Sequence, residues 1–389
     1  MRVLMAAGAS TGGLYAYTDA LCYGLSKTGA DVTVLTNTLW ADLQRPYKVE
    51  RCQFEFTDKK KQWSQLHWAA DRFYRSLSNS LRRNRYAVGN CFDVVHFQEA
   101  GTPLLDQFFL KPLTRRLPVV LTVHDVKPHY ERFVGRASFI KRSLGIPHRL
   151  IVHYEAGKRQ LVDHWGVSAE CIDIIPHGIM PVQNRPDQTD ARKRLNLSLD
   201  RQIILFFGAV RPNKGLDVLL KALEIVKSRN RRVLLVIAGG LLGRFNFEPY
   251  ADIIKNFDLS DSVKSFIKFI PEEEVDDFFA ASDLVVLPYL KFEAQSGVLL
   301  RAYAHRKPVV VSNVGAMGEL VVSDKVGLVV EPGAVEPLAE VVTNALNSLD
   351  KFQSHYSPEL EEKYSWKHIA ELTMRSYEAA IRGKLEKQR

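Results

Sequence analysis

Two cations stand close together in a segment where an apolar run, a glycine and a helix-like pattern follow one another. Between Ile203 and Ala222, Gly208 ends the apolar run, and Arg211 and Lys214 precede the helix-like part. Arginine offers a planar fork of donors, lysine a mobile point charge, and the amino end of a helix a partial positive charge. These residue types at this spacing predict a site for a diphosphate group.

A turn of small residues follows the first apolar run of the chain. Residues 8–15 read Gly-Ala-Ser-Thr-Gly-Gly-Leu-Tyr, so Gly12 and Gly13 stand where a helix opens and free N–H groups can bind a phosphate or a sugar oxygen. The spacing fits neither the GxGxxG fingerprint nor the GxxxxGK(S/T) nucleotide loop, so we infer no nicotinamide cofactor. The alternative is that the glycines only allow a strand and a helix to pack closely.

His124 also ends an apolar run, and Asp125 follows it. Such a histidine can contact a substrate, can be a core residue with a satisfied hydrogen bond, or can form a metal pair with the aspartate. The metal interpretation lacks further ligands at a suitable spacing, and two cations near the expected diphosphate make a divalent ion redundant. The acidic residues within 272–277 are better explained as the first turn of a helix. We therefore expect neither a metal ion nor a cofactor.

The elements that must position these residues alternate regularly along the 389-residue chain. Short β-branched runs are separated by longer amphipathic stretches, which is typical of parallel strands joined by crossover helices. The pattern occurs twice, on either side of a polar, proline-containing segment at Met180–Asp190. It predicts two doubly wound α/β domains, residues 1–180 and 181–362, with ligands bound in a cleft between them. A helix in 363–389 could pack back across the N-terminal domain.

The expected strands and helices are given by residue range. The strands are Arg2–Ala6, Asp31–Thr36, Asp93–Phe97, Pro118–Val123, Leu150–His153 and Ile172–Ile175 in the first set, and Gln202–Phe207, Val233–Ala238, Ser265–Phe269, Leu284–Leu287 and Pro308–Ser312 in the second. The helices include Gly13–Lys27, Glu155–His164, Leu216–Ser228, Pro271–Ala281, Gly297–His305 and Lys363–Lys387.

The composition, 46% hydrophobic and 25% charged, provides enough apolar mass for two cores. No apolar run approaches the roughly 18 to 20 residues of a membrane span, and Met1–Met5 lead into strand-like sequence without a signal-peptide pattern. The cysteines Cys22, Cys52, Cys91 and Cys171 lie 30, 39 and 80 positions apart, which excludes CxxC and zinc-ligand spacings. We expect them to be buried thiols in a reducing cytoplasm.

Around Arg211 and Lys214 the chain resembles the GxxRxxKG signature of the retaining glycosyltransferases of family 4. That resemblance implies the GT-B fold, with two Rossmann-like domains, the first binding the acceptor and the second the nucleotide sugar. It extends over nearly the whole chain. Other similar segments are the glycine loop at Gly12–Gly13, the histidine-bearing strand end at Thr122–Asp125, the interdomain crossover at Ile175–Ile179, and the C-terminal segments Ala281–Pro288 and Gly315–Val321.

One motif of that family is incomplete. In the Glu-x7-Glu pair, Glu293 matches the first acid, whose family role is to contact the donor sugar, and Arg301 replaces the second, which usually holds the nucleotide ribose. A guanidinium only donates hydrogen bonds, so we expect Arg301 to bind the diphosphate or a carboxylate on the sugar rather than pair with an acid such as Glu293. Ser296, Gly297 and Val298 still open a helix whose N–H groups could bind a phosphate.

By this resemblance the chain would move a sugar from a UDP- or GDP-sugar to a hydroxyl acceptor, with retention at the anomeric carbon and no metal ion. Arg211 and Lys214 would neutralise the departing diphosphate, and His124 would hydrogen-bond the sugar near its reacting face, with the Gly12 loop closing against it. Glu319 would touch the nucleotide; a solvated acid at a helix end is its alternative. The acceptor would be a glycan or a lipid-linked intermediate of cell-surface polysaccharide synthesis.

Arg301 also motivates a second hypothesis, a catalytically degraded protein that binds sugar nucleotides or glycans, which a turnover assay would distinguish. A phosphorylase-like enzyme of the same fold is disfavoured, because the chain is short and no lysine for a pyridoxal cofactor can be assigned.

The net charge of +9 comes from the first half of the chain, since residues 51–150 hold 18 Lys and Arg against 8 Asp and Glu. Aromatic and basic residues interleave between Lys59 and Arg85, as suits an interfacial helix at anionic headgroups. The alternative is a solvated basic face, with Trp63 and Trp68 packed in the core. A nucleic-acid partner is not expected, because no recognised binding module accompanies the charge. We therefore expect a cytoplasmic protein that could contact the inner face of a membrane.

Overall fold

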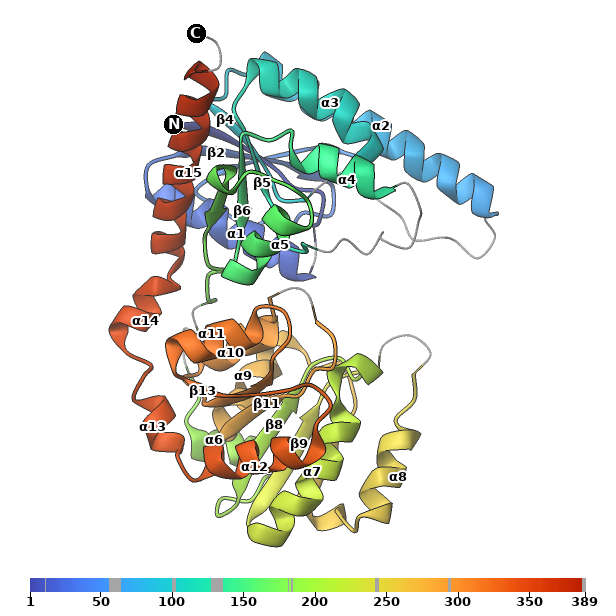
Figure 1. Ribbon diagram of the computed structural model, residues 1–389, viewed down its shortest axis with the longest axis vertical. Coiled ribbons are helices and arrows are strands. Elements are labelled where there is room, and N and C mark those ends of the chain that lie inside the picture. Colours follow the sequence, from blue (N-terminus) through green and yellow to red (C-terminus); the bar gives the residue numbers. More distant parts are fainter. Residues whose placement is uncertain are drawn as a thin grey trace. The chain divides into compact units, whose positions relative to one another are not determined.

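The computed structural model describes residues 1–10, 12–55, 64–99, 103–126, 136–180, 182, 185–241, 245–292 and 295–386. The chain divides into two compact units, each built on its own sheet (Figure 1). The first unit contains Met1–Gly178 together with Lys363–Arg389, and the second contains Ile179–Glu362.

The sheet of the first unit has seven parallel strands in the order β3-β2-β1-β4-β5-β6-β7. The strands are β1 (Arg2–Ala6), β2 (Asp31–Asn37), β3 (Lys48–Gln53), β4 (Val94–Phe97), β5 (Val119–Thr122), β6 (Arg149–Val152) and β7 (Ile172–Ile174). The helices are α1 (Gly12–Lys27), α2 (Gln65–Gly89), α3 (Pro103–Arg116), α4 (Arg136–Leu144), α5 (Glu155–Asp163), the short η1 (Ala169–Cys171) and α15 (Trp366–Glu386). The strand order reverses between β1 and β4, which is where open parallel sheets bind ligands.

Strand β1 is apolar and buried from Val3 to Ala6 because helices cover both faces of the sheet. Val3 and Met5 belong to one hydrophobic cluster, while Leu4 and Ala6 belong to the other. Successive side chains of a strand point to opposite faces, so neighbouring residues pack into the cores on the two sides of the sheet. The continuous apolar runs in the sequence follow from this arrangement.

Helix α15 completes the first unit although it comes from the far end of the chain. Its residues Ile369, Ala370 and Tyr377 belong to the same hydrophobic cluster as Val3 and Met5 of β1. A Cβ atom at Gly24 of α1 would lie 2.5 Å from the carbonyl oxygen of Trp366. Only glycine at this position lets the two helices approach so closely.

The sheet of the second unit has six parallel strands in the order β10-β9-β8-β11-β12-β13. The strands are β8 (Gln202–Phe207), β9 (Val233–Ala238), β10 (Val263–Phe266), β11 (Leu284–Leu287), β12 (Val309–Ser312) and β13 (Gly327–Val330). The helices are α6 (Gln188–Arg194), η2 (Pro212–Lys214), α7 (Leu216–Arg229), α8 (Glu248–Asn256), η3 (Ser260–Ser262), α9 (Glu272–Ala281), α10 (Gly297–Ala304), α11 (Met317–Asp324), α12 (Val335–Leu346), α13 (Leu349–Gln353) and α14 (Pro358–Lys363).

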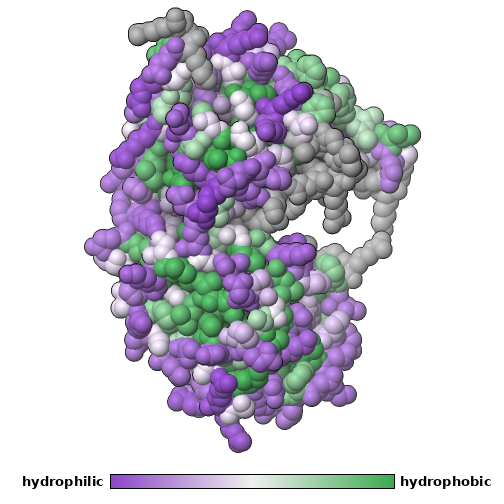
Figure 2. All heavy atoms as spheres, viewed as in Figure 1, coloured by the Kyte–Doolittle hydropathy of each residue, from purple (hydrophilic) through white to green (hydrophobic). Residues whose placement is uncertain are grey.

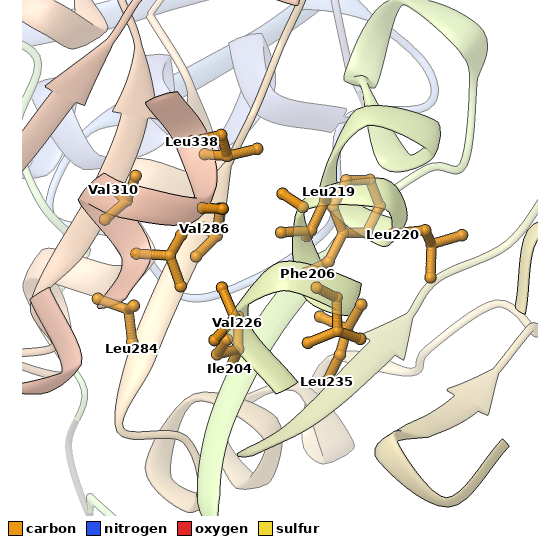
Figure 3. Packing of buried hydrophobic residues seen from close by; sticks show 14 of the residues in the cluster. Ile204, Phe206, Leu219, Leu220, Val226, Leu235, Leu284, Val286, Val310 and Leu338 are labelled. Atoms are coloured by element: carbon orange, nitrogen blue, oxygen red, sulfur yellow. The ribbon is translucent and has the colours of Figure 1, made fainter. Parts of the chain in front are cut away.

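The core of the second unit joins the sheet to α7 and α12. Figure 3 shows Ile204 and Phe206 of β8 and Val286 of β11 beside Leu219 of α7 and Leu338 of α12. All five side chains are fully buried. This packing fixes the ends of β8 and β11, from which the loops described below emerge.

Most of the elements expected from the sequence are confirmed, with small changes at their ends. Strands β3 and β13 were not expected, and β10 begins two residues before the expected Ser265. β3 is only partly buried and lacks a strong apolar pattern, which is why its sequence gave no signal. The expectation of four buried thiols is confirmed only for Cys22: Cys52 and Cys171 are partly buried, and Cys91 is exposed in a turn with a φ of 52°.

Within the described residues, no helix is long and apolar enough to cross a membrane. The same part of the chain contains no cluster of three or more His, Cys, Asp or Glu side chains suited to hold a metal ion.

Candidate functional site

The loop after β8 carries the two predicted cations. Arg211 precedes η2, and Gly215 ends it with a φ of 67° before α7 begins. A Cβ atom at Gly215 would lie 1.9 Å from the carbonyl oxygen of Pro288, so only glycine lets this loop pass so close to the end of β11. Gly208 leaves β8 with a φ of 106°, which also favours glycine. The expected order of strand, glycine, cations and helix is confirmed.

The ammonium group of Lys214 packs against aromatic rings. Its Nζ lies 3.4 Å from the ring centre of Tyr289 and 4.5 Å from that of Phe292. Burial, together with the positive charge of Arg211, lowers the pKa of Lys214 to about 8. Among the residues that the structure describes, no carboxylate forms an ion pair with either cation. A bound anion would relieve this repulsion, so the loop is suited to receive one.

The first turn of α10 lies beside this loop. The Ser296 hydroxyl caps the helix by accepting a hydrogen bond from a backbone N–H of the first turn at 3.4 Å. A Cβ atom at Gly208 would lie 3.4 Å from Cγ2 of Val298, so the end of β8 adjoins the start of α10. No described atom lies within 4 Å of the Cβ position of Gly297. Both amide atoms of Gln295 are buried without a hydrogen-bond partner in the described part of the chain.

Arg301 lies on α10 between two carboxylates of α9. Its Nη2 donates to Oε1 of Glu272, and its Nε lies 3.4 Å from Oδ1 of Asp276. The Arg301 side chain is 18% exposed, and Asp276 also bonds Nε2 of His305 at 2.9 Å. The expectation that Arg301 has no acidic partner is wrong, whereas its role toward an anionic group of the donor stays a prediction. The packing of α10 against α9 brings the acidic first turn of α9 to the guanidinium. The acidic partners are therefore Glu272 and Asp276, whereas Glu293 was the acid considered from the sequence.

The other acidic residues considered for the site are Glu293, Glu319 and the acidic residues at the start of α9. Glu293 lies outside the described residues. Glu319 is partly buried in the first turn of α11, which follows Gly315 with its φ of 57°. The residues Glu272–Glu274 form the acidic first turn of α9, as the sequence predicts.

In the first unit, four neighbouring strands end in polar groups at one edge of the sheet. Gln98 follows β4, His124 follows β5, His153 follows β6, and Ile175 follows β7. Nδ1 of His124 lies 3.1 Å from Nε2 of His153, and Nε2 of His124 lies 3.4 Å from Oε1 of Gln98. Nδ1 of His153 lies 2.9 Å from the carbonyl oxygen of Ile175. Because the strands are parallel neighbours, these groups form a row along their carboxyl ends.

Burial keeps the histidines of this row neutral. Desolvation lowers the pKa of His153 to about 4, and desolvation with repulsion from His153 lowers the pKa of His124 well below its ordinary value. The ring of Tyr17 packs against both imidazoles, with ring centres 4.8 Å from His124 and 5.3 Å from His153. His124 is nevertheless partly exposed at the sheet edge. It is therefore a hydrogen-bonded core residue and also accessible to a ligand.

The glycine loop after β1 is open on the side where α1 begins. Gly12 has a φ of 75°, and no described atom lies within 4 Å of a Cβ position at Gly12 or Gly13. The alternative that these two glycines allow close packing is therefore not supported. The carboxylate of Glu99 holds the loop by accepting a hydrogen bond from the N–H of Ala9 at 2.8 Å, and burial raises the pKa of Glu99.

Four residues of these two sites were not predicted: Gln98, His153, Tyr289 and Phe292. His153 ends an expected strand, and the shared carboxyl edge of parallel strands could have placed it near His124. Nothing in the sequence pattern joins Tyr289 or Phe292 to a lysine 75 or more positions earlier. Their contact depends on how the loops after β8 and β11 fold together.

Two family models match this chain. Residues 11–182 match the model described as Glycosyltransferase Family 4, and residues 187–359 match the one described as Glycosyl transferases group 1. Curated relatives include the D-inositol 3-phosphate glycosyltransferase of Rhodococcus jostii (strain RHA1), 28% identical over 240 residues that cover 60% of this chain and 52% of the relative. The corresponding protein of Nocardia farcinica (strain IFM 10152) is 27% identical over 286 residues, covering 68% and 62%. The chain spans about half the length of the first of these relatives.

Solved structures with this fold include a glycosyltransferase from Rickettsia africae ESF-5, with a TM-score of 0.74 and 16% identity over 97% of this chain and 98% of the other. Sucrose-phosphate synthase from Thermosynechococcus elongatus has a TM-score of 0.72 and 19% identity, with coverages of 97% and 98%. The Anabaena protein HepE in complex with UDP has a TM-score of 0.72 and 18% identity, with coverages of 97% and 100%. The chain thus belongs to the family 4, group 1 glycosyltransferases, and its two Rossmann-like domains have the GT-B fold.

Proposed function

We propose that this chain transfers a sugar from a UDP- or GDP-sugar to a hydroxyl acceptor, with retention at the anomeric carbon. The observation that carries this proposal is the pair formed by Arg211 and Lys214, which have no carboxylate partner among the described residues. A departing nucleoside diphosphate develops negative charge as the glycosidic bond breaks. Fixed cations at that position stabilise the transition state more than the ground state.

The other residues have supporting roles in this proposal. The open backbone at Gly297 and the loop at Gly208 would receive the phosphates, and Glu319 the nucleotide. His124 would bond the sugar, and Glu293 would hold it as in the family motif. Because the two cations supply the positive charge, we propose that the reaction needs no metal ion.

The donor and acceptor classes are supported by the comparisons to different degrees. HepE, a protein of the same fold, has been crystallised with UDP and with UDP-glucose. The curated relatives are named for D-inositol 3-phosphate, a polyhydroxyl compound. We propose an acceptor of that general chemistry, a glycan or a lipid-linked intermediate of cell-surface polysaccharide synthesis.

A panel of UDP- and GDP-sugars tests the proposal by calorimetry and by product analysis with mass spectrometry. One donor should bind, and its binding should weaken in Arg211→Ala and Lys214→Ala. Lys221→Ala is the matched control, because Lys221 is exposed on α7 away from the loop. If both loop variants bound every nucleotide as the native protein does, the pair would not be the diphosphate site.

A binding protein without turnover is the second candidate. It is favoured by Arg301, which stands where the family motif has the acid that holds the nucleotide ribose and which is paired with two acids of α9 instead. Donor binding without transfer or hydrolysis, measured with several acceptors, would support this candidate. Transfer to any acceptor would exclude it.

We also propose that α2 rests on an anionic membrane during the reaction. Five large apolar side chains of α2 are 40% to 84% exposed: Leu66, Phe73, Tyr74, Leu81 and Val88. At 3.6 residues per turn they lie within about 100° of arc, so they form one stripe along the helix. Hydrophobic residues are visible over α2 and α3 at the upper right of Figure 2.

The charge around this apolar stripe matches an anionic surface. Arg72, Arg82 and Arg85 are exposed on the same helix, and Asp71, its one acid, is paired with Arg75. Each cation near the surface would contribute about 1 kcal/mol, and salt would weaken the contact.

Vesicle flotation tests the membrane proposal. The protein should float with phosphatidylglycerol vesicles at low salt and remain unbound with phosphatidylcholine. Leu81→Asp should lose most of this binding. Leu199→Asp is the control and should keep it, because Leu199 lies in the second unit and is 53% exposed, close to the 51% of Leu81. Equal recovery with both vesicle types would show that the stripe is only a solvated helix face.

A further inference from the structure

In the row of polar groups at the edge of the first sheet, the hydrogen-bond partners determine which ring nitrogen of each histidine carries the proton. A backbone carbonyl can only accept a hydrogen bond, so Nδ1 of His153 must donate its proton to the oxygen of Ile175 at 2.9 Å. His153 is 3% exposed, and desolvation disfavours its charged form. Its Nε2 therefore carries a lone pair and no proton.

This lone pair decides the state of His124. Nδ1 of His124 lies 3.1 Å from Nε2 of His153, and only a proton on that Nδ1 makes the contact a hydrogen bond. The opposite arrangement would require His153 to carry protons on both nitrogens, which means a positive charge in the core. The ring of Tyr17 packs on both imidazoles and limits their exposure to water.

The far nitrogen of His124 is then an acceptor. It faces Oε1 of Gln98 at 3.4 Å. The amide nitrogen of Gln98 is directed elsewhere, to Sδ of Met5 at 2.9 Å and to Nε2 of His96 at 3.3 Å. A separation of 3.4 Å is long for a hydrogen bond and suits two acceptors that face each other. Among the described residues, no donor is directed at this lone pair.

We propose that His153 is a positioning residue that holds His124 in the tautomer protonated on Nδ1, so that Nε2 accepts a hydrogen bond from a hydroxyl of the bound sugar. This inference rests on the proposed function for its ligand. It adds a direction to that contact: the sugar hydroxyl donates and the enzyme accepts. A deoxy or fluoro sugar at that position cannot donate, so the site would discriminate against it.

The tautomer can be measured in the native full chain without any activity. Protein labelled with 15N-histidine gives long-range nitrogen–proton spectra in which the two neutral tautomers have distinct patterns, and His124→Asn identifies the signal of His124. The expected pattern is a protonated Nδ1 and a bare Nε2. A protonated Nε2 on His124, or a charged ring at neutral pH, would overturn the proposal.

Variants of His153 test whether it sets the tautomer. His153→Gln offers a carbonyl oxygen near the former Nε2 and should keep the His124 pattern, with kcat within about threefold of native. His153→Leu removes the acceptor; the His124 signal should change to the other tautomer or a mixture, and kcat should fall by about tenfold or more with a smaller change in KM. His96 is an equally buried histidine that bonds Thr122 and Tyr377, and it contacts the row through the amide nitrogen of Gln98 at 3.3 Å. His96→Gln is the control for core damage and should keep the His124 pattern.

The positioning role of His153 and the proposed function can fail independently. An unchanged His124 pattern in a folded His153→Leu protein would show that His153 does not set the tautomer. If no donor is turned over by the native protein, the proposed function fails, whereas the spectra still decide the positioning role.

Discussion

Acidification should destabilise the first unit, because it buries several neutral histidines. His96 and His153 are 0% and 3% exposed. Desolvation lowers the pKa of His96 to about 3 and that of His153 to about 4, against an ordinary value near 6.5. In the unfolded chain both imidazoles take up protons below pH 6.5, whereas in the folded unit they stay neutral until the pH reaches their lowered pKa values. Stability is therefore complete above pH 6.5 and is lost as the pH falls from there toward 4 and then 3.

The size of the effect follows from these pKa values. Between pH 7.5 and 5.5 each of the two histidines should cost about 1.4 kcal/mol, or about 3 kcal/mol together. His124 and His177 have lowered pKa values for the same main reason and act in the same direction. A loss of about 3 kcal/mol is a large part of the stability of an ordinary domain. With a urea slope near 2 kcal/mol/M, the unfolding midpoint should fall by about 1 to 2 M.

Tryptophan fluorescence reports this unit alone. The five tryptophans, at positions 40, 63, 68, 165 and 366, all belong to the first unit. Urea unfolding is therefore followed by tryptophan emission at pH 7.5 and pH 5.5.

His96→Gln and His153→Gln isolate the histidine contribution from that of the carboxyl groups. The difference in unfolding free energy between native protein and each variant should shrink by about 1.4 kcal/mol on going from pH 7.5 to 5.5, because the glutamine variant has no proton to take up. A difference that stays constant over this range would refute the reasoning, since it would mean that the histidine titrates equally in the folded and unfolded states.

Three further predictions concern the second unit. Arg211→Ala and Lys214→Ala should each raise the transition-state barrier by about 2 to 4 kcal/mol, with Lys221→Ala unchanged in steady-state kinetics; native rates in both loop variants would contradict the assignment. Turnover should persist in excess EDTA, and activity that is lost there and restored by magnesium or manganese would show that a metal ion is required. Arg301→Glu should lower the unfolding free energy of the second unit by about 1 to 3 kcal/mol, because it adds a carboxylate beside the two acids of α9; an unchanged thermal midpoint would argue against these ion pairs.

The strand ends could be predicted because they depend on local pattern. Apolar runs of β-branched residues mark buried parallel strands, and their ends fixed the loops that carry His124, Arg211 and Lys214. The helix that begins after Ser296 was predictable for the same reason, since a serine cap before an apolar repeat is a local signal. Strand β3 was not predicted because its side chains are exposed or half-buried and show no alternation of apolar and polar residues.

The partners of charged side chains could not be predicted in the same way. Arg301 and Glu272 are 29 residues apart, and their pairing depends on the packing of α10 against α9. The sequence places Arg301 at a position of the family motif and offers several anions that it could bind. Nothing in the sequence favours an acid at the start of another helix over an anionic group of the ligand. The ring contact of Lys214 with Tyr289 is similar, because it joins loops from two strands.

The row formed by Gln98, His124, His153 and Ile175 lies between these two cases. Each residue follows an expected strand, so the residues themselves could be named from the sequence. Their order in space required the sheet order β4-β5-β6-β7, which consecutive right-handed crossovers make the simplest arrangement. Once that order is known, a histidine at the end of β6 must face the histidine at the end of β5, and the carbonyl beyond β7 determines which nitrogen of each ring carries the proton. If His124 binds the sugar as proposed, the direction of that hydrogen bond is set by a backbone carbonyl two strands away.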